Sequence, residues 1–533
     1  MHRVLVTDDV DSEGVALLLA EPSLQVDVLP TLPVPDLLER IGEYDAIVGR
    51  SATRISRDLL ERASRLKVVG RAGVGIDNIA VDVATALGVA VINAPAGNTV
   101  AVAELFFGAV IGLLRQIPRA DTGMHGGKWE RSALLGRELK GKVLGIVGLG
   151  RIGGEVAVRA HAFGMTVVAY DPYVSDERFT ALRVRRATTL EALLTETNIL
   201  TVHTPLTEET RGLIGARELG RLPAKSVVVN MARGGIVDED ALVAALEADQ
   251  LRGAVIDVFM HEPLAVDHPL RRAENVLLTP HLGANSVEAQ RNVAKDVCAG
   301  VRDALLRHDL SRSVNVSAAS GDWGDMQPAM LLARRAAAVA RALLADQGTR
   351  AITQLAVRCG PALAGGSSAL LASAAVGVLE GVLETDRLNL INARTLADAR
   401  GIACTVGTSS DLGHARAIEV SLGGGMQQLA VAGIATPDAV RLTRIGAFHV
   451  DVNPRQTLVV LTNHDVPGVI GRVGTLLGEA QVNIAEYHQA RLAQGGDALA
   501  AITVDGEVSE AVRQALLAVP EIQTATIVRL SDR

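Results

Sequence analysis

The stretch VLGIVGLGRIGGEVAVRAHA at residues 143–162 decides the fold of this chain. An apolar run leads into Gly148-Leu149-Gly150-Arg151-Ile152-Gly153 and then into a helical pattern that ends near Ala162. In such a unit the first glycine permits a tight turn, the second lets a pyrophosphate approach the backbone, and the third lets the helix lie close to the strand. We therefore predict a strand, a glycine turn and a helix whose N-terminus binds phosphate.

A carboxylate stands where such a unit recognises a ribose. A second apolar run, Thr166 to Tyr170, ends at Asp171, which lies 18 residues after Gly153. An acid at this place accepts hydrogen bonds from a ribose 2′-hydroxyl and repels a 2′-phosphate. The alternative is a glycine turn between ordinary packed elements, but strand, helix and acid all occur in register. The pattern favours NAD over NADP as the cofactor.

The composition limits the class of protein. The chain has 533 residues, too many for one hydrophobic core, and its net charge of −8 with short positive runs argues against a nucleic-acid partner. Three cysteines far apart, without a CxxC motif, argue against disulfides and a metal site and favour a reducing, cytoplasmic compartment. No signal peptide or membrane span is predicted, because the most apolar helical stretch, Ala101 to Leu114, is too short to cross a bilayer.

The first half of the chain predicts two nested α/β domains. Short apolar runs alternate with helical patterns through residues 1–97 and again through residues 98–284, which predicts two doubly wound parallel sheets. A long amphipathic stretch, Ser286 to Arg307, should lead the chain back to the first unit. We predict a flavodoxin-like substrate-binding domain from residues 1–97 and 285–316, with a Rossmann-like NAD-binding domain, residues 98–284, inserted into it.

The second half predicts two further domains. After Val316 the composition changes to Ala and Gly, and Gly321 to Asp325 is interpreted as a linker. Residues 317–452 are expected to form a separate α+β domain. Residues 453–533 give the order strand, helix, strand, strand, helix, strand, which is the ferredoxin-like βαββαβ plan.

Arginines follow two strands of the first unit. Arg50 and Arg71 stand in glycine-bounded loops directly after apolar runs. Ligands of open parallel sheets bind at the carboxyl ends of the strands. Either arginine alone could be a solvated surface charge. Two of them at one sheet edge favour an anionic substrate, because guanidinium groups match carboxylate and phosphate oxygens.

Three reactive side chains, Arg233, Glu262 and His281, each follow a strand of the second unit and can face one crevice. A histidine can take the proton of a hydroxyl group, a neighbouring carboxylate would orient its ring and favour the imidazolium, and an arginine would bind a carboxylate and polarise a carbonyl. A lone histidine after a strand is more often structural, and a glutamate before proline can be a surface residue. The prediction of an acid/base pair depends on Glu262 and His281 lying together.

These motifs resemble those of the D-isomer-specific 2-hydroxyacid dehydrogenases. The matching stretches within residues 1–315 are Arg50 to Thr53, Arg71 to Asn78, Gly148 to Gly153, Asn230 to Asp238, Glu262-Pro263 and Pro280 to Ala284. Residues Leu388 to Ala393 and Ala399 to Ile402 more loosely resemble the intervening domain of long members that act on phosphoglycerate. The last module, with Asp465-Val466-Pro467-Gly468 at its first turn, is similar to ACT domains, which usually bind an amino acid.

The resemblance implies roles for particular residues. The catalytic set is Arg233, Glu262 and His281. The substrate contacts are Arg50, Ser51, Arg71, Asn98 and, across a dimer interface, Arg131. The cofactor contacts are Val74, Gly148, Gly150, Arg151, Ile152, Gly153, Asp171, Thr204, Met231, Ala232, Arg233, Asp257, His281, Leu282, Gly283 and Ala284.

The implied activity is NAD-dependent oxidation of D-3-phosphoglycerate to 3-phosphohydroxypyruvate, the first step of L-serine biosynthesis. One alternative is another D-2-hydroxyacid dehydrogenase, acting on glycerate or lactate. The other is a non-catalytic NAD sensor that recruits partners, which the absence of a polar low-complexity tail disfavours.

Regulation and assembly are expected from the same resemblance. We predict that Asn463, Asp465 and Asn483 of one ACT module converge on free serine, which would lie between the modules of two subunits. The alternative is that these residues only shape a turn, as Asn and Asp often do. A homotetramer is expected, with the apolar helix from Ala101 to Leu114 suited to a symmetric interface.

Overall fold

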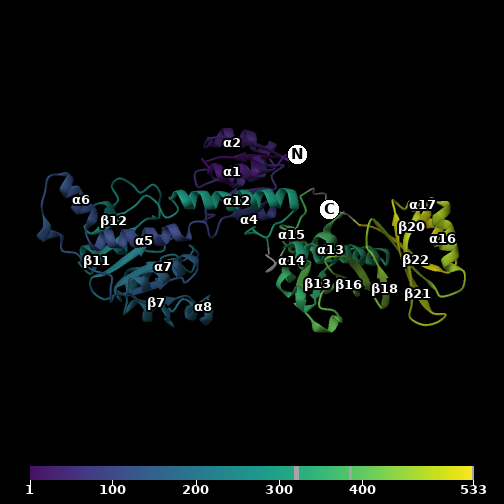
Figure 1. The fold of residues 1–533 in the computed structure, drawn as a ribbon. Coiled ribbons are helices and arrows are strands. Elements are labelled where there is room, and N and C mark those ends of the chain that lie inside the picture. The colour runs from purple at the N-terminus through teal and green to yellow at the C-terminus, as the bar shows by residue number, and fades with distance from the viewer. Residues whose placement is uncertain (317–322, 383–386, 531–533) are drawn as a thin grey trace.

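A computed structural model describes residues 1–316, 323–382 and 387–530. Its four sheets occupy successive parts of an elongated molecule (Figure 1). The first sheet lies above the long helix α12, the unit of the second sheet is at the left, and the two C-terminal units follow at the right. The α/β architecture predicted from the sequence is confirmed, while the division into four domains at the stated boundaries stays a prediction.

The first sheet is all parallel, in the order β2-β1-β3-β4-β5. This is the flavodoxin-like order that the sequence predicts. Its strands are β1 (His2–Val6), β2 (Leu24–Val28), β3 (Ala46–Gly49), β4 (Val68–Arg71) and β5 (Ala90–Asn93). The helices between them are α1 (Ser12–Leu19), α2 (Val34–Arg40), η1 (Ile41–Glu43), α3 (Arg57–Arg62) and α4 (Val81–Ala86).

The second sheet is also parallel, in the order β12-β11-β10-β9-β6-β7-β8. The strand order reverses between β6 and β9, which is where a doubly wound sheet binds its ligand. Its strands are β6 (Val143–Val147), β7 (Thr166–Tyr170), β8 (Arg185–Arg186), β9 (Ile199–Val202), β10 (Ser226–Asn230), β11 (Leu251–Ile256) and β12 (Val276–Leu278). The helices are α5 (Thr99–Leu114), α6 (Ile117–His125), η2 (Arg131–Leu134), α7 (Arg151–Ala162), α8 (Asp176–Ala181), α9 (Leu190–Leu194), α10 (Ala216–Leu219), α11 (Glu239–Glu247) and η3 (Pro269–Arg271).

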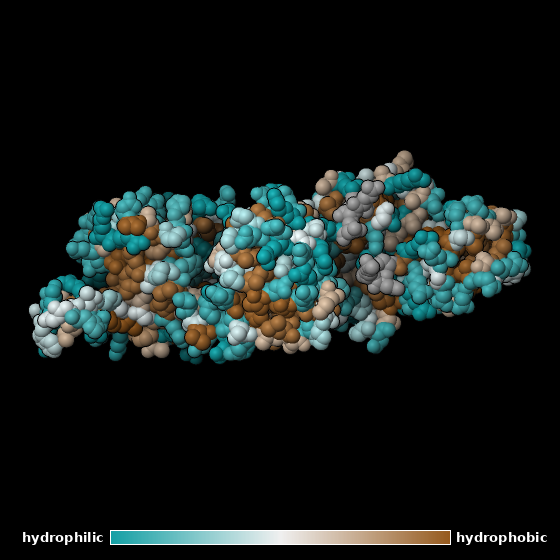
Figure 2. Space-filling view, turned by 90° about the horizontal axis from the view of Figure 1, so that it is seen from above, coloured by the Kyte–Doolittle hydropathy of each residue, from teal (hydrophilic) through white to brown (hydrophobic). Residues whose placement is uncertain are grey.

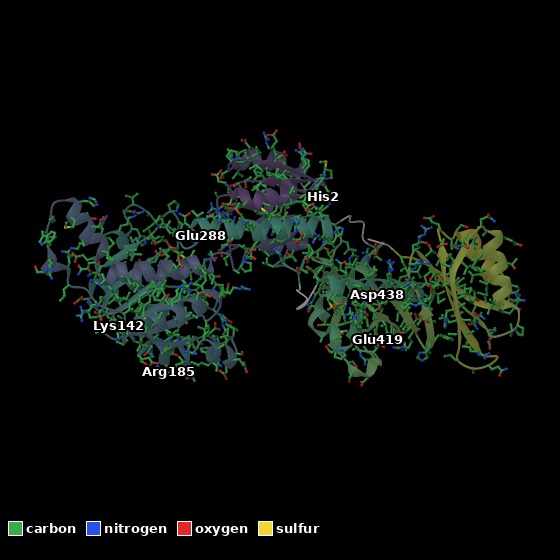
Figure 3. The ribbon with its side chains drawn as sticks, viewed as in Figure 1. His2, Lys142, Arg185, Glu288, Glu419 and Asp438 are labelled. Atoms are coloured by element: carbon green, nitrogen blue, oxygen red, sulfur yellow. The ribbon has the colours of Figure 1, made fainter. Side chains whose placement is uncertain are left out.

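Helix α12 (Val287–Arg307) returns the chain to the first sheet, as predicted. Glu288 in its first turn lies between the two parallel-sheet units (Figure 3). The helix packs so closely on α1 that a Cβ on Gly14 would lie 2.5 Å from the carbonyl carbon of Ala294. Beyond it, Val314 N donates to Val91 O at 2.8 Å, which places the segment beside β5.

The third unit has a mixed sheet in the order β14-β13-β15-β16-β17-β18. Its strands are β13 (Gln354–Cys359), β14 (Ala403–Thr408), β15 (Ala417–Gly424), β16 (Gln427–Ala435), β17 (Val440–Ile445) and β18 (Phe448–Val452). Its helices are α13 (Trp323–Asp346), η4 (Pro361–Gly366), α14 (Ser367–Leu379), α15 (Ala393–Ala399) and η5 (Ser410–Leu412).

The predicted linker at Gly321 to Asp325 is wrong for its second part. Gly321 and Asp322 lie outside the described residues, but Trp323 begins α13 and is only 5% exposed. Its apolar ring packs into a core, so the polar and glycine residues around it did not mark the end of ordered structure.

The last unit is an antiparallel sheet with two helices. Its elements are β19 (Thr457–His464), α16 (Val469–Glu479), β20 (Asn483–Arg491), β21 (Asp497–Asp505), α17 (Glu510–Leu517) and β22 (Ile522–Arg529), and the sheet order β20-β21-β19-β22 confirms the ferredoxin-like plan. Leu458, Leu499 and Val528 belong to the same buried cluster as residues of α13. One face of this sheet is therefore packed against the third unit.

Apolar helices in the described residues are core helices. Helix α5 buries Phe106 and Val110, and its exposed positions include Val100 and Glu104, so burial within its own chain accounts for its apolar character. The stretch Pro361–Leu379 is long and apolar enough to cross a membrane, but 72% of its most apolar window is buried in the protein. Helices α5 and α6 pass the same test only if counted as one span, and they are bent by 64°.

Candidate active site

His281 and Glu262 lie side by side after strands β12 and β11. His281 Nδ1 is 2.8 Å from Glu262 Oε2, and Glu262 Oε1 accepts a hydrogen bond from Phe259 N at 3.0 Å. With Nδ1 directed at the carboxylate, Nε2 is the nitrogen left for a substrate proton. The two side chains are 48% and 37% exposed, so a small molecule can reach them.

The loop that carries His281 is fixed by a buried carboxylate. Asp257 is fully buried, and it accepts hydrogen bonds from Thr279 Oγ1 at 2.6 Å, Leu282 N at 2.7 Å and Gly283 N at 2.9 Å. His281 N donates to the backbone oxygen of Asp257 at 2.9 Å. The structure thus gives Asp257, predicted to lie near the nicotinamide, a role in shaping the loop of His281.

Three arginines share one electrostatic environment at the facing edges of the two parallel sheets. Burial, together with repulsion from Arg233 and Arg50, lowers the pKa of Arg71 to about 10. Arg71 Nε is buried without a partner among the described residues. Since like charges held together in a poorly solvated site repel one another, this cluster favours an anionic ligand.

A glycine loop makes room for these guanidinium groups. A Cβ on Gly73 would lie 1.4 Å from Arg71 Nη1, and one on Gly75 would lie 2.2 Å from Arg233 Nη2. Arg233 Nε also donates to Asp77 Oδ2 at 3.1 Å. The loop from Gly73 to Asp77, on the first unit, therefore contacts Arg233 of the second, and a ligand at this point touches both units.

Other predicted substrate residues are placed differently. Ser51 is exposed beside Arg50. The side-chain oxygen of Asn98, at the start of α5, is buried and has no partner within residues 1–316, 323–382 and 387–530. Arg131 is exposed in η2, on an arm formed by α6 and η2 that projects from the left end of the molecule (Figure 2). Arg131 does not join the other arginines within one chain.

The glycine turn after β6 is shaped for a pyrophosphate. Gly148 has a φ of 93°, and a Cβ on Gly153 would lie 2.1 Å from Gly148 O, so both positions require glycine. A Cβ on Gly150 would meet nothing within 4 Å, which leaves the backbone open to a ligand. Arg151 and Ile152 begin α7 directly after it.

Side chains around this turn also fit a dinucleotide. Asp171 accepts hydrogen bonds from Leu149 N at 2.8 Å and Tyr173 N at 2.9 Å, which holds its carboxylate beside the turn. Thr204 Oγ1 is buried and has no hydrogen-bond partner in the part of the chain that the structure describes. Val74, Met231, Ala232, Leu282, Gly283 and Ala284 all lie in loops at the carboxyl ends of strands β4, β10 and β12.

Comparisons with known proteins agree with this geometry. Residues 107–283 match the NAD-binding domain of D-isomer specific 2-hydroxyacid dehydrogenases, and residues 457–521 match the ACT domain. A Synechocystis D-3-phosphoglycerate dehydrogenase is 37% identical over 99% of this chain and 95% of its own length. A Bacillus subtilis protein of the same name is 36% identical over 99% of this chain and 100% of its own. The chain belongs to the D-isomer-specific 2-hydroxyacid dehydrogenases.

A solved structure supports the cofactor of this dehydrogenase. The NAD-bound 3-phosphoglycerate dehydrogenase of Entamoeba histolytica superposes with a TM-score of 0.51 at 27% identity and covers 59% of this chain and 98% of its own. The cofactor of the present dehydrogenase is NAD, and the protein is an NAD-dependent oxidoreductase.

Sequence reasoning missed several residues of the dehydrogenase cleft. His203 Nδ1 is buried without a hydrogen-bond partner among the residues described, and burial lowers the pKa of His203 to about 4, so this imidazole is a weak base at neutral pH. Arg178 Nη2 donates to Gly150 O at 3.0 Å and braces the glycine turn. Asp77 was within a matched stretch and could have been singled out, whereas Arg178 carries no local signal.

The predicted effector residues do not all come together in one chain of the dehydrogenase. Asp465 contacts Arg491 Nη1 and Gly495 N, and Asn463 accepts from Gln489 Nε2 at 3.2 Å. Asn483 donates to Asp505 Oδ2 at the other end of the sheet. The prediction of convergence within one module is wrong, because β19 and β20 run in the same direction and Asn483 begins β20 while Asn463 nearly ends β19.

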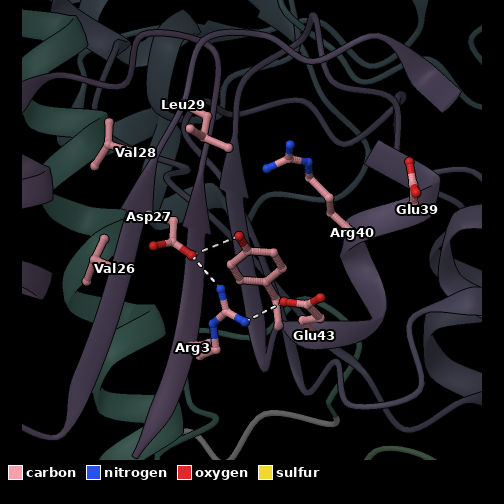
Figure 4. Close-up of a pocket in the computed structure, with 9 residues that line it drawn as sticks. Arg3, Val26, Asp27, Val28, Leu29, Glu39, Arg40 and Glu43 are labelled. Carbon is pink, nitrogen blue, oxygen red and sulfur yellow. Dashed lines mark hydrogen bonds and ion pairs between the residues drawn. The ribbon is translucent and has the colours of Figure 1, made fainter. Parts of the chain in front are cut away.

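A separate hollow of about 650 Å³ in the dehydrogenase is not the active site (Figure 4). It lies beside β1 and β2, and Arg3 and Asp27 in its lining are paired with each other. Arg3 Nη2 donates to Asp27 Oδ2 at 2.9 Å, and Tyr44 Oη donates to the same oxygen at 2.8 Å. None of the predicted site residues lines it.

Proposed function

We propose that this dehydrogenase oxidises D-3-phosphoglycerate to 3-phosphohydroxypyruvate and thereby starts L-serine biosynthesis. The observation that supports the substrate is the cluster of Arg50, Arg71 and Arg233. Phosphoglycerate carries a carboxylate and a phosphate, so it needs more cations than an unphosphorylated hydroxy acid does. The relatives named D-3-phosphoglycerate dehydrogenase that align with almost the whole chain support the same proposal.

In this mechanism Arg233 binds the substrate carboxylate and directs the C2 hydroxyl towards His281. His281 Nε2 takes the hydroxyl proton while the hydride leaves C2, so that one proton and one hydride are removed and a carbonyl forms. Bound NAD supplies the hydride acceptor. Glu262, at 2.8 Å from Nδ1, stabilises the imidazolium that results.

The remaining arginines bind the phosphate. Arg50 and Arg71 lie on the first unit, across the cleft from the glycine turn. A ligand held by both units favours a closed arrangement that keeps water from the reacting carbon. Reduction of the keto acid uses the same residues in reverse, with Arg233 polarising the carbonyl oxygen.

The substrate proposal is tested by NADH formation with D-2-hydroxy acids of similar size, with and without a phosphate. We expect kcat/KM for phosphoglycerate to exceed that for glycerate and lactate by roughly a hundredfold, as loss of a doubly charged anchor implies. Equal values for glycerate would support the alternative of a general D-2-hydroxyacid dehydrogenase. No NADH with any of the acids would support the non-catalytic alternative.

The ACT module is proposed to bind serine between two chains. Strand β20 is at the edge of its sheet, so its copy in a second chain can pair with it antiparallel across a two-fold axis. Such pairing would bring Asn483 of the second copy to the end of the sheet where Arg491 contacts Asp465 at 3.1 Å. The three predicted effector residues then meet across the interface.

The arm formed by α6 and η2 is proposed to take part in a dimer within a homotetramer. Trp129 is 80% exposed and Leu135 is 87% exposed, and both lie on this arm with Arg131. Large exposed apolar side chains on a projecting segment suit burial against a second copy.

The three free cysteines suit a reducing compartment, so we place the enzyme in the cytoplasm.

A further inference from the structure

The loop that carries Arg50 is held by a carboxylate that takes no part in the reaction described above. Asp8, just after β1, is 5% exposed and has a φ of 63°. Its Oδ2 accepts hydrogen bonds from Arg50 N at 2.7 Å and Thr53 N at 2.9 Å. Its Oδ1 accepts from Thr53 Oγ1 at 2.7 Å and Thr31 Oγ1 at 2.8 Å.

Asn78 holds the same loop from the other side. Its Nδ2 donates to Arg50 O at 3.0 Å and to Thr53 O at 2.7 Å. Both the N–H and the C=O of Arg50 are therefore fixed by buried or half-buried side chains. The approach is close, since a Cβ on Gly49 would lie 2.9 Å from Thr7 Oγ1 and 3.3 Å from Asp8 Oδ2.

The burial of the Asp8 carboxylate costs free energy, so its retention indicates that the position of the Arg50 loop matters. Burying an anion is unfavourable, and the four hydrogen bonds to Asp8 offset that cost; three of them come from the loop of Arg50 and Thr53. Asp8 is also close enough to Arg71 to raise its pKa, against the larger lowering by burial and by Arg233 and Arg50. It therefore acts on two of the three clustered arginines.

We propose that Asp8 is a positioning residue for the phosphate of the substrate, with Asn78 as its counterpart. It fixes the backbone from which the Arg50 side chain extends and offsets part of the repulsion between Arg50 and Arg71, without touching the substrate. The proposal rests on the proposed function, because a doubly anionic substrate gives these arginines their ligand.

The test compares Asp8→Ala, Asp8→Asn and Asn78→Ala with Asp45→Asn as the matched control. Asp45 is 3% exposed and directly precedes β3, whereas Arg50 directly follows it, and its Oδ2 accepts from Arg3 N at 2.9 Å. We expect Asp8→Ala to raise KM for phosphoglycerate about tenfold, with kcat within about twofold of the wild type and NAD affinity unchanged. Asp8→Asn should raise KM less than Asp8→Ala does, since the amide oxygen of asparagine still accepts hydrogen bonds.

Asp45→Asn should lower the unfolding midpoint without moving KM. An unchanged KM in both Asp8→Asn and Asn78→Ala would overturn the proposal, even if Asp8→Ala fails to fold. An equal rise of KM in Asp45→Asn would also overturn it, because general loosening of the first unit would then explain the effect. If the wild type prefers another D-2-hydroxy acid, the substrate assignment fails separately, and the same variants are compared on that acid's KM.

Discussion

The catalytic cleft and the polar end of the ACT sheet contain similar residues in opposite states. In the cleft, Arg71 Nε, Asn98 Oδ1 and Thr204 Oγ1 are buried without partners among the described residues. In the ACT module, Asp465 and Asn483 each have a side-chain partner in their own chain. Because a buried unsatisfied polar group costs free energy, the cleft is organised for a ligand within one chain. The proposed effector site in the ACT module is not organised in this way within one chain.

The difference follows from where each site lies in its fold. The cleft is formed by loops at the carboxyl ends of two sheets, and these loops leave polar atoms unpaired where two units face each other. The ACT residues stand at the ends of strands within one small sheet, where local turns and neighbouring strands satisfy them. A ligand there must displace an existing contact or use a second chain.

Of the variants that test this contrast, His281→Ala should have the largest effect, a loss of turnover. Loss of the general acid/base should lower kcat roughly 10²–10⁴-fold while leaving NAD binding nearly intact. The neighbouring exposed residue provides a control, since His261→Ala should leave kcat near that of the wild type. Steady-state NADH production and cofactor fluorescence measure the two quantities. Near wild-type turnover in His281→Ala would exclude His281 as the general acid/base.

Smaller effects are expected from Arg71→Met, which should stabilise the fold but weaken the binding of the substrate. The folded-state pKa of Arg71, about 10, lies below the ordinary value for arginine, so the charged form is destabilised by folding at every pH below about 10. That penalty is lost only as the pH rises above about 10 towards the ordinary arginine pKa. At neutral pH the variant should therefore raise the unfolding midpoint by roughly 2 °C while raising KM at least about tenfold.

The exposed residue Arg54 supplies the control for that variant. Arg54→Met should change neither the unfolding midpoint nor KM appreciably. Calorimetry without substrate and initial rates with phosphoglycerate give the two readouts. A lower midpoint for Arg71→Met would mean that the buried arginine stabilises the fold, and the contrast between the two regions would weaken.

The smallest effect is expected in the ACT module. Asp465→Ala should weaken serine binding about tenfold, because the serine ammonium loses its carboxylate partner, and should leave basal kcat unchanged. Asp497→Ala removes an exposed carboxylate at the same end of the sheet and should leave serine affinity unchanged. Titration calorimetry measures both. Serine that binds both variants as the wild type does would exclude Asp465, and no binding of millimolar serine to the wild type would exclude serine.

Local patterns predicted the catalytic half well. Strands at Val143–Val147 and Thr166–Tyr170 have the bounds expected from the sequence, because buried parallel strands are short apolar runs and glycine turns separate them from helices. The contact between Glu262 and His281 was also expected, since both follow neighbouring strands of one parallel sheet.

The order of elements, the glycine turn and the residue types at the strand ends could be read from local patterns, since these depend on spacing within about ten residues. Which side chains meet across long separations could not, because that depends on how distant segments pack. Asp8 reaches Arg50, Asn78 reaches the same loop, and Asn483 lies far from Asn463. These outcomes depend on strand order and register, which arise from packing between distant segments and leave no periodic signal in the chain.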